Sequence, residues 1–290
     1  MAPSPRSRTE PGPLSQQRRS LSARLGDEGA KGSLIAAGST VVVFGLITVV
    51  VVRSPNWPAV RDQFFSPEDF RASAPNVVRG FWLNLRVFAA AMVTIPIVAM
   101  VLAIVRSLRG PAFFPVRLLA VVYIDLFRGI PAILLVTVLG FGVPALQIPG
   151  LPNSGLFWGT AALTLSYAAY TAEIYRSGID AVPESQRSSA RALGLTQFQA
   201  LRYAILPQAI RNVIPALMNL VVALQKDVAL VSVLGIRDAA HEADIYKART
   251  FNYTGFVVAT LLFLAISVPL TRFVDWYAAR DRARRAQSSV

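Results

Sequence analysis

Four charged residues interrupt otherwise apolar stretches of this sequence: Asp125, Arg128, Lys226 and Asp227. An ionised group is costly to bury in hydrocarbon, so a charge kept inside an apolar segment is a functional candidate by default. A carboxylate accepts hydrogen bonds from an ammonium group, and a guanidinium or ammonium group donates to a carboxylate. These residues could therefore bind the two charged ends of a small zwitterion.

Asp125 and Arg128 are three residues apart, which places them on one face of a helix and allows them to pair. Gly129 and Pro131 follow at once and can bend or loosen that helix. The segment is compatible with two roles, as the lining of a translocation path or as a structural ion pair that neutralises itself.

Lys226 and Asp227 are adjacent, and adjacent residues do not face one another on a helix. Each is therefore expected to have a different partner. Ser232 lies just beyond them and adds a hydroxyl group to the same segment.

Membrane-spanning helices must position these residues. The 290-residue chain is 54% hydrophobic and 16% charged, and its mean hydropathy is +0.49. A hydrocarbon core needs about 20 apolar residues to cross it, and backbone groups in lipid must bond within their own segment. We therefore predict an all-α polytopic membrane protein with about six transmembrane helices. They are expected at about 33–52, 80–105, 118–140, 156–176, 209–235 and 254–276.

The distribution of Lys and Arg predicts the orientation of the chain. With both termini in the cytoplasm, the inner segments hold 18 of these residues and the outer segments hold 7. This is the positive-inside bias. The net charge of +13 is therefore attributed to topology and to anionic lipid headgroups, and nucleic-acid binding is not expected. The absence of cysteine excludes disulfides and thiolate metal sites, and no metal site is expected.

The chain is expected to have five parts. Residues 1–32 would form a disordered basic cytoplasmic tail, and 33–52 an extra first transmembrane helix. Residues 53–79, which contain four prolines, would form an external loop. Residues 80–276 would form the compact transmembrane domain, and 277–290 a second basic cytoplasmic tail.

A charged cassette at about 183–207 lies between two predicted spans. Pro183 suits the first turn of a helix, Gly194 readily adopts the left-handed conformation that ends one, and Thr196 with Gln199 matches a capping box. We predict two short helices joined by an elbow of small residues, which would let another protein approach closely. The residues alone are also compatible with an amphipathic hairpin lying on lipid, whereas tethering between two spans argues against a helix-turn-helix DNA binder.

The cassette resembles the signature loop of ABC-importer permeases, whose pattern is Glu-Ala-Ala, three residues, Gly, nine residues and Ile-x-Leu-Pro. The aligned positions here are Ser188-Ser189-Ala190, Gly194 and Ala204-Ile205-Leu206-Pro207. The spacing holds, but Ser replaces both the opening Glu and the first Ala, and Ala204 replaces the Ile.

Flanking segments narrow the resemblance to the polar amino-acid uptake branch, over about residues 80–276. The similar segments are Phe127-Arg-Gly-Ile-Pro131, Ala172-Glu-Ile-Tyr-Arg-Ser-Gly-Ile179, Val182-Pro-Glu-Ser-Gln186, Ala190-Arg-Ala-Leu-Gly194 and Leu206-Pro-Gln-Ala-Ile-Arg211.

The resemblance implies that the cassette forms a coupling helix that docks in a cleft of a cytoplasmic ATPase. The residues that would take this role are Glu184, Arg187, Ser188, Ser189, Ala190, Arg191, Gly194, Leu206 and Pro207.

The resemblance also implies that the charged segments lie near the translocation path. The family commonly has Lys-Asp-Thr/Ser-Ser-Leu where this chain has Lys226-Asp227-Val228-Ala229-Leu230, so a hydroxyl is missing at Val228. The candidates for the substrate pathway are Asp125, Arg128, Gly129, Pro131, Lys226, Asp227 and Ser232.

The implied partners are ABC ATPase subunits, a second permease subunit that is identical or related, an extracytoplasmic solute-binding protein and membrane lipid. The chain lacks Gly-x-x-x-x-Gly-Lys-Ser/Thr, so ATP and Mg are expected on the ATPase and no catalysis is expected in this chain. The outer stretch Asp238–Arg249 is expected to form a short surface helix, which would face the binding protein or only solvent. Two alternatives remain at this stage: an autonomous secondary transporter or channel, and a membrane scaffold that recruits a cytoplasmic partner.

Overall fold

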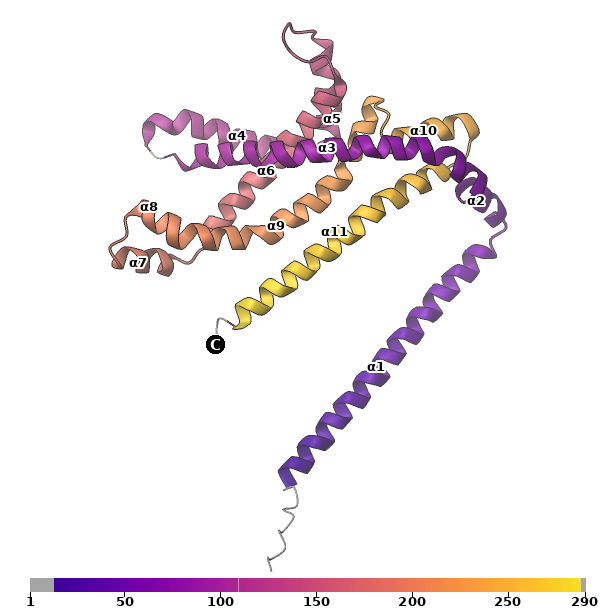
Figure 1. The fold of residues 1–290 in the computed structure, drawn as a ribbon, viewed down its shortest axis with the longest axis horizontal. Coiled ribbons are helices and arrows are strands. Elements are labelled where there is room, and N and C mark those ends of the chain that lie inside the picture. The colour runs from indigo at the N-terminus through magenta and orange to yellow at the C-terminus, as the bar shows by residue number, and fades with distance from the viewer. Residues whose placement is uncertain (1–12, 109, 288–290) are drawn as a thin grey trace, which may run out of the picture. The chain divides into compact units, whose positions relative to one another are not determined.

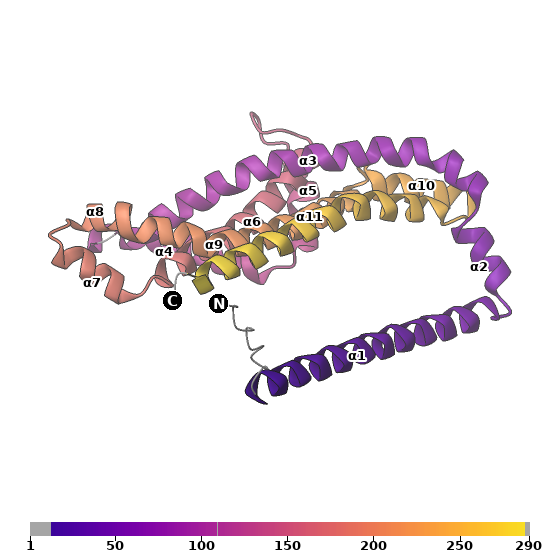
Figure 2. The ribbon, with the colours of Figure 1, turned by 60° about the horizontal axis from the view of Figure 1, so that its bottom comes forward.

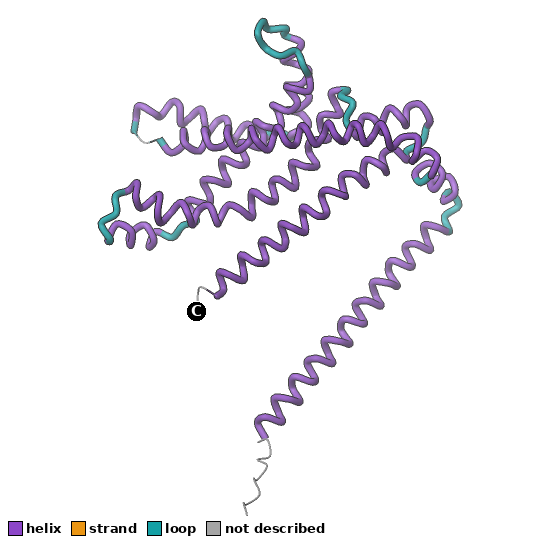
Figure 3. The backbone as a smooth tube through the Cα atoms, viewed as in Figure 1, coloured by secondary structure: helices purple, strands orange, loops and turns teal. Residues whose placement is uncertain are grey.

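The computed structural model describes residues 13–108 and 110–287, and helices are the only regular secondary structure in that part of the chain (Figure 3). The chain divides into two units, residues 1–61 and 62–290, and each is described by itself.

The first unit consists mainly of α1 (Pro13–Val52). Its stretch Ile35–Val52 has the length and hydropathy of a membrane span, and none of it is buried. The backbone is helical from Pro13 onward, which differs from the disordered tail expected for residues 1–32; residues 1–12 lie outside the described part. Proline suits the first turn of a helix, and the Leu, Gln, Arg and Ala residues that follow are good helix formers.

The second unit begins within α2 (Trp57–Phe64), and its longest helix is α3 (Pro67–Ser107). Most of the segment 53–79, for which a loop was predicted, is helical; its location outside the membrane stays a prediction. Ser66 caps α3 by accepting a hydrogen bond of 3.2 Å from the backbone N–H of Asp69. This N-cap followed by proline and two acidic residues is a helix-start signal, and Pro75 is accommodated inside the helix.

The single span predicted for residues 118–140 is a bent pair of helices. After the short η1 (Pro111–Phe113), α4 (Phe114–Gly129) and α5 (Ala132–Ala145) meet at 107°. Ile130 between them is extended, with φ −93° and ψ 131°. A residue before proline is driven out of the helical region by the proline ring, so the break occurs at this point.

At the centre of the second unit lies α6 (Gly155–Asp180), which contacts α3, α4, α5 and α9 (Figure 1). Its buried positions are mostly small residues, so neighbouring helices approach closely. Four helices in the described part of the chain are long and apolar enough to cross a membrane, or five if the bent pair counts as one span. The predicted span 156–176 falls in α6, whose Thr, Ser and Tyr residues keep it outside that set.

After the cassette that follows α6, α9 (Leu206–Asp227) leads into the 3-10 helix η3 (Val228–Leu234). The span predicted at 209–235 therefore changes its helix type at residue 228. Leu234 packs against α5 and α6 where Gly140 and Gly159 leave room for its methyl groups. The chain then forms α10 (Ala239–Thr250) and α11 (Thr254–Gln287).

A buried amide, the side chain of Asn84, connects α3 to η3 and α10. Its Nδ2 donates to the carbonyl oxygen of Val228 at 3.3 Å and to Asp238 Oδ2 at 2.9 Å, and its Oδ1 accepts from the backbone N–H of Ala239 at 3.1 Å. Gly80 makes this approach possible, because a Cβ there would collide with the backbone of Asp238.

We expect Asn84→Leu to destabilise the protein by about 3 kcal/mol, because it removes three hydrogen bonds and leaves a buried carboxylate without its amide partner. Thermal unfolding of the purified chain in detergent measures the effect. Asn76→Leu is the matched control, since Asn76 is exposed on the same helix. Equal unfolding temperatures for the two variants would contradict the role assigned to Asn84.

Candidate functional site

One cavity of about 490 Å³ lies where the α4–α5 break faces α6 and α9. It brings together four of the predicted pathway residues, Arg128, Gly129, Pro131 and Asp227. We call it the central cavity. Its lining residues are Arg128, Gly129, Ile130, Pro131, Ala132, Ser166, Tyr167, Tyr170, Leu220, Ala223 and Asp227.

Asp227 is held at the last turn of α9 by a tyrosine of α6. The Tyr167 hydroxyl donates a hydrogen bond of 2.7 Å to Asp227 Oδ2. Asn84 binds the carbonyl oxygen of the next residue, Val228, so the backbone on the other side of Asp227 is also fixed. A carboxylate has two oxygens, so this bond leaves the second one for a ligand.

The positively charged residue of the central cavity, Arg128, packs over the ring of Tyr170. The guanidinium of Arg128 lies 5.6 Å from the ring centroid of Tyr170, and the Tyr170 hydroxyl donates to the Arg128 carbonyl oxygen at 3.1 Å. The ring face attracts the cation and orients it. Among the described side chains, no ion pair joins Asp125 to Arg128, so the self-neutralising pair that was one of the two possibilities does not form.

Asp125, Lys226 and Ser232 do not line the central cavity. Lys226 lines a different cavity of about 730 Å³ on the α11 side, which agrees with the expectation that it and Asp227 have different surroundings. The carbonyl oxygen of Ser232 accepts from the backbone N–H of Gly235 at 3.0 Å, at the end of η3.

Sequence reasoning missed Tyr167 and Tyr170. Their spacing of three residues places both hydroxyl groups on one face of α6, and this is the signal that could have identified them. Tyr167 also lines an apolar cavity of about 170 Å³ between α3, α6 and α9, which contains the buried Thr171. Tyr167 therefore stands between two cavities.

Outside the predicted spans, Asp238 caps α10 by accepting from the backbone N–H of His241 at 2.9 Å. Burial raises the pKa of its carboxyl above the ordinary value, while hydrogen bonds from Asn84 and from the backbone of His241 and Ala240 act in the opposite direction. The helix predicted over Asp238–Arg249 is present as α10. Its first turn is buried, in contrast to the surface location expected for the whole helix.

The second predicted site, the cassette, forms two short helices joined by a turn. The first is α7 (Glu184–Ala192), preceded by Pro183, and the second is α8 (Gln197–Ala200), with the predicted capping box between Thr196 and Gln199. Gly194 joins them with φ +79°. The backbone N–H of Leu195 donates to the Ala190 carbonyl at 3.2 Å, as expected for a helix that ends in a left-handed residue.

The cassette presents apolar side chains away from the helix bundle. Leu193 is 81% exposed, and Phe198 and Tyr203 are each 67% exposed. Exposed apolar groups of this size are available to contact another protein or lipid. We call Leu193, Phe198 and Tyr203 the docking face.

The proposed coupling residues differ in their surroundings. Ser188 and Ser189 are exposed, and Glu184 forms an exposed ion pair with Arg191 at 3.3 Å. The side chain of Arg187 lies outside the described part of the structure. Ala190 is buried against the rest of the loop. Leu206 and Pro207 begin α9 and are exposed.

A small apolar cluster connects the cassette to the helices on either side. Val182, Ile205 and Ala209 pack together with Ile179 at the end of α6. One turn of π-helix, η2 (Leu201–Ile205), lies between α8 and α9. The cassette is thus continuous with the two helices that bear Tyr167 and Asp227.

Comparisons with known proteins agree with this description. Residues 110–282 match the family model described as binding-protein-dependent transport system inner membrane component. The chain is 33% identical over 208 residues to the arginine transport system permease protein ArtQ of Bacillus subtilis, covering 70% of this chain and 92% of that protein. It is 34% identical over 177 residues to a putative glutamine transport system permease protein of Rickettsia conorii, covering 61% of this chain and 79% of that protein.

Solved structures share the fold. A crystal structure of an amino acid ABC transporter with histidines matches with a TM-score of 0.64 and 29% identity, covering 71% of this chain and 94% of that one. Since the described part of the chain has four helices long and apolar enough to cross a membrane, this is a multi-pass membrane protein, and the chain belongs to the family of binding-protein-dependent transport system inner membrane components.

Proposed function

We propose that this chain is the permease subunit of an ATP-driven ABC importer for polar amino acids of the glutamate, glutamine and basic amino-acid class. The observation that carries an amino-acid substrate is the central cavity, which is lined by both Arg128 and Asp227. The relatives named for arginine and glutamine transport support the same class.

The geometry of the central cavity suits the backbone of an amino acid. Arg128, oriented by Tyr170, is a donor for the substrate carboxylate, and Asp227, oriented by Tyr167, is an acceptor for the ammonium group. A volume of about 490 Å³ falls within the usual range for small-molecule sites.

The energy for transport would come from separate ATPase subunits, which bind ATP and Mg and contact the docking face. This chain lacks a phosphate-binding loop of its own. A second permease subunit, identical or related, would complete the pathway, and an extracytoplasmic solute-binding protein would deliver the substrate. In this arrangement the cassette and both termini are cytoplasmic, in the cell inner membrane.

The cassette is covalently continuous with α6 and α9, two of the helices that line the central cavity. Movement of the docking face would pass through the cluster at Val182 and Ile205 to the ends of α6 and α9. Because these helices carry the two partners of the Tyr167–Asp227 hydrogen bond, a change in their relative position would alter the central cavity. ATP binding would thus favour one of two conformations of the pathway, which is what alternating access requires.

Asp227→Asn is expected to lower amino-acid uptake about tenfold or more, because it removes a charge-assisted hydrogen bond to the substrate ammonium group. Uptake of radiolabelled arginine and glutamine in cells or proteoliposomes that contain the whole transporter measures this. The neighbouring variant Lys226→Gln is the matched control, since Lys226 lines another cavity. Full uptake by the Asp227→Asn variant would contradict the role assigned to Asp227 in binding the substrate.

Gly194→Asp is expected to abolish co-purification of an ATPase with the tagged chain in mild detergent, because a non-glycine residue at φ +79° strains the turn by about 1 kcal/mol and places a charge beside the docking face. Gly150→Asp is the matched control, since Gly150 has φ +86° in the loop between α5 and α6. Mass spectrometry of the co-purified proteins gives the result. If the wild-type chain brings down no ATPase in several detergents, an autonomous transporter becomes the better explanation.

A further inference from the structure

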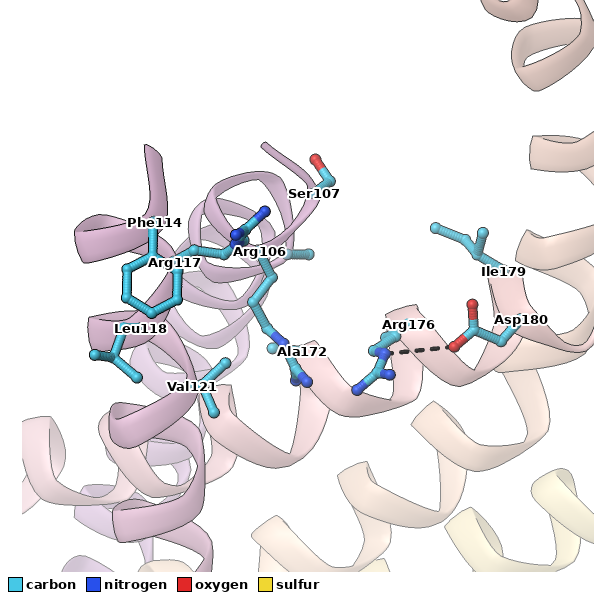
Figure 4. Close-up of a pocket in the computed structure, with 11 residues that line it drawn as sticks. Arg106, Ser107, Phe114, Arg117, Leu118, Val121, Ala172, Arg176, Ile179 and Asp180 are labelled. Atoms are coloured by element: carbon cyan, nitrogen blue, oxygen red, sulfur yellow. Dashed lines mark ion pairs between the residues drawn. The ribbon is translucent and has the colours of Figure 1, made fainter. Parts of the chain in front are cut away.

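A fourth cavity, of about 450 Å³, has a basic rim contributed by three helices (Figure 4). Arg106 comes from the last turn of α3, Arg117 from the first turns of α4 and Arg176 from the last turns of α6. Apolar side chains of α4, Phe114, Leu118 and Val121, form the adjoining wall. We call this the arginine pocket.

The charges around the arginine pocket are only partly balanced. Arg106 forms an ion pair of 2.6 Å with Glu173, and Arg176 lies 3.7 Å from Glu173 and 3.4 Å from Asp180. Arg117 instead donates to the Leu108 carbonyl oxygen at 3.2 Å, and no carboxylate among the described residues pairs with it. Three arginines face two carboxylates, which leaves one positive charge in excess.

The arginine pocket lies at the end of the bundle that carries the cassette. The turn between α3 and α4 and the helices α7 and α8 are at the same end in both ribbon views (Figures 1 and 2). Arg106 follows directly on the apolar part of α3. An arginine at the end of an apolar membrane helix lies at the level of the lipid headgroups.

We propose that the arginine pocket binds one anionic phospholipid, with its phosphate group between Arg117 and Arg176 and an acyl chain along Leu118 and Phe114. The recognised group is a phosphate ester, and the wall of the pocket identifies its source. Phe114 is 54% exposed and Leu118 is 48% exposed, and an acyl chain covers these side chains whereas a soluble phosphate does not. Basic pockets between membrane helices on the cytoplasmic side are suited to anionic headgroups.

This lipid would hold the end of α6, which leads into the cassette, against α3 and α4. It contacts α3, α4 and the last turns of α6, where Arg176, Ile179 and Asp180 lie three to seven residues before Pro183. Only the assignment of this end to the cytoplasmic leaflet depends on the proposed function. Lipid binding itself can be measured without the ATPase, so failure of one proposal is distinguishable from failure of the other.

The test uses the full-length chain purified in neutral detergent. Dioleoyl phosphatidylglycerol and dioleoyl phosphatidylcholine, which have identical acyl chains, are titrated separately, and native mass spectrometry counts the retained lipids while thermal unfolding reports stabilisation. Glycerol 3-phosphate is titrated as the soluble phosphate ester. We expect one phosphatidylglycerol to be retained and to raise the unfolding temperature, with a smaller effect of phosphatidylcholine and none of glycerol 3-phosphate.

Arg117→Gln is expected to weaken phosphatidylglycerol retention about fivefold, as one basic contact to an anionic lipid predicts, and Arg117→Lys should restore most of it. Leu118→Ser should weaken retention without changing the preference for the anionic headgroup. Arg280→Gln is the matched control, because Arg280 is near the inner end of α11, outside the arginine pocket, and lies 5.3 Å from the Trp276 ring centroid.

Three results would overturn the proposal. The first is an equal response of the wild-type chain to the two lipids, which does not depend on whether any variant folds. The second is an equal loss in Arg117→Gln and Arg280→Gln, since that would indicate unspecific attraction to basic residues. The third is the same stabilisation by glycerol 3-phosphate at matched concentration, which would make the arginine pocket a site for a soluble anion.

Discussion

The arrangement of this bundle depends on one buried amide. Asn84 forms hydrogen bonds both to the start of η3 and to the cap of α10, through Val228, Asp238 and the Ala239 N–H. A buried polar group is costly unless its hydrogen bonds are made, so these three partners hold one another in place. Val228 follows Asp227 directly. The bonds that hold Val228 therefore also determine where the Asp227 carboxylate, the candidate acceptor for a substrate, lies.

The break at Gly129–Pro131 positions Arg128 of the central cavity, as Asn84 positions the segment that carries Asp227. A continuous helix over 118–140 would carry the residues before and after the break along one axis. The bend of 107° turns α5 away instead and leaves Arg128 and the backbone of the break facing α6 and α9. The cation and the carboxylate of the central cavity therefore come from two interruptions of helical geometry, the bend after α4 and the 3-10 turn after α9. Irregular backbone of this kind is tolerated at membrane depth only where it is buried in protein or lines a cavity.

The features that were predictable from sequence are those with local causes. The cassette follows from Pro183, Gly194 and the Thr196 capping box, because helix ends are determined by residues within one turn. Of the four charged candidates, Arg128 and Asp227 line the central cavity, whereas Asp125 and Lys226 do not. Adjacency in sequence links Arg128 to Asp125, whereas packing brings it to Tyr170 and into one cavity with Asp227. Those contacts join residues more than 40 positions apart, and no periodicity reports them. The four prolines at 53–79 led to the prediction of a loop, but most of this segment is helical. The N-cap at Ser66 starts α3, and Pro75 is accommodated inside it.

The composition of α6 has a consequence for how the protein is made. Its small and hydroxyl-bearing residues suit a central position among four helices, but they also keep it outside the helices that are apolar enough to enter a membrane on their own. Partition of a segment from the translocon into lipid follows its hydrophobicity, so α6 has to enter together with apolar neighbours that cover its polar groups. α5 immediately precedes it and packs against it. Biogenesis of this chain therefore requires the α5–α6 hairpin to assemble during insertion rather than after it, and the residues that pack the finished bundle are already needed while the chain is still being synthesised.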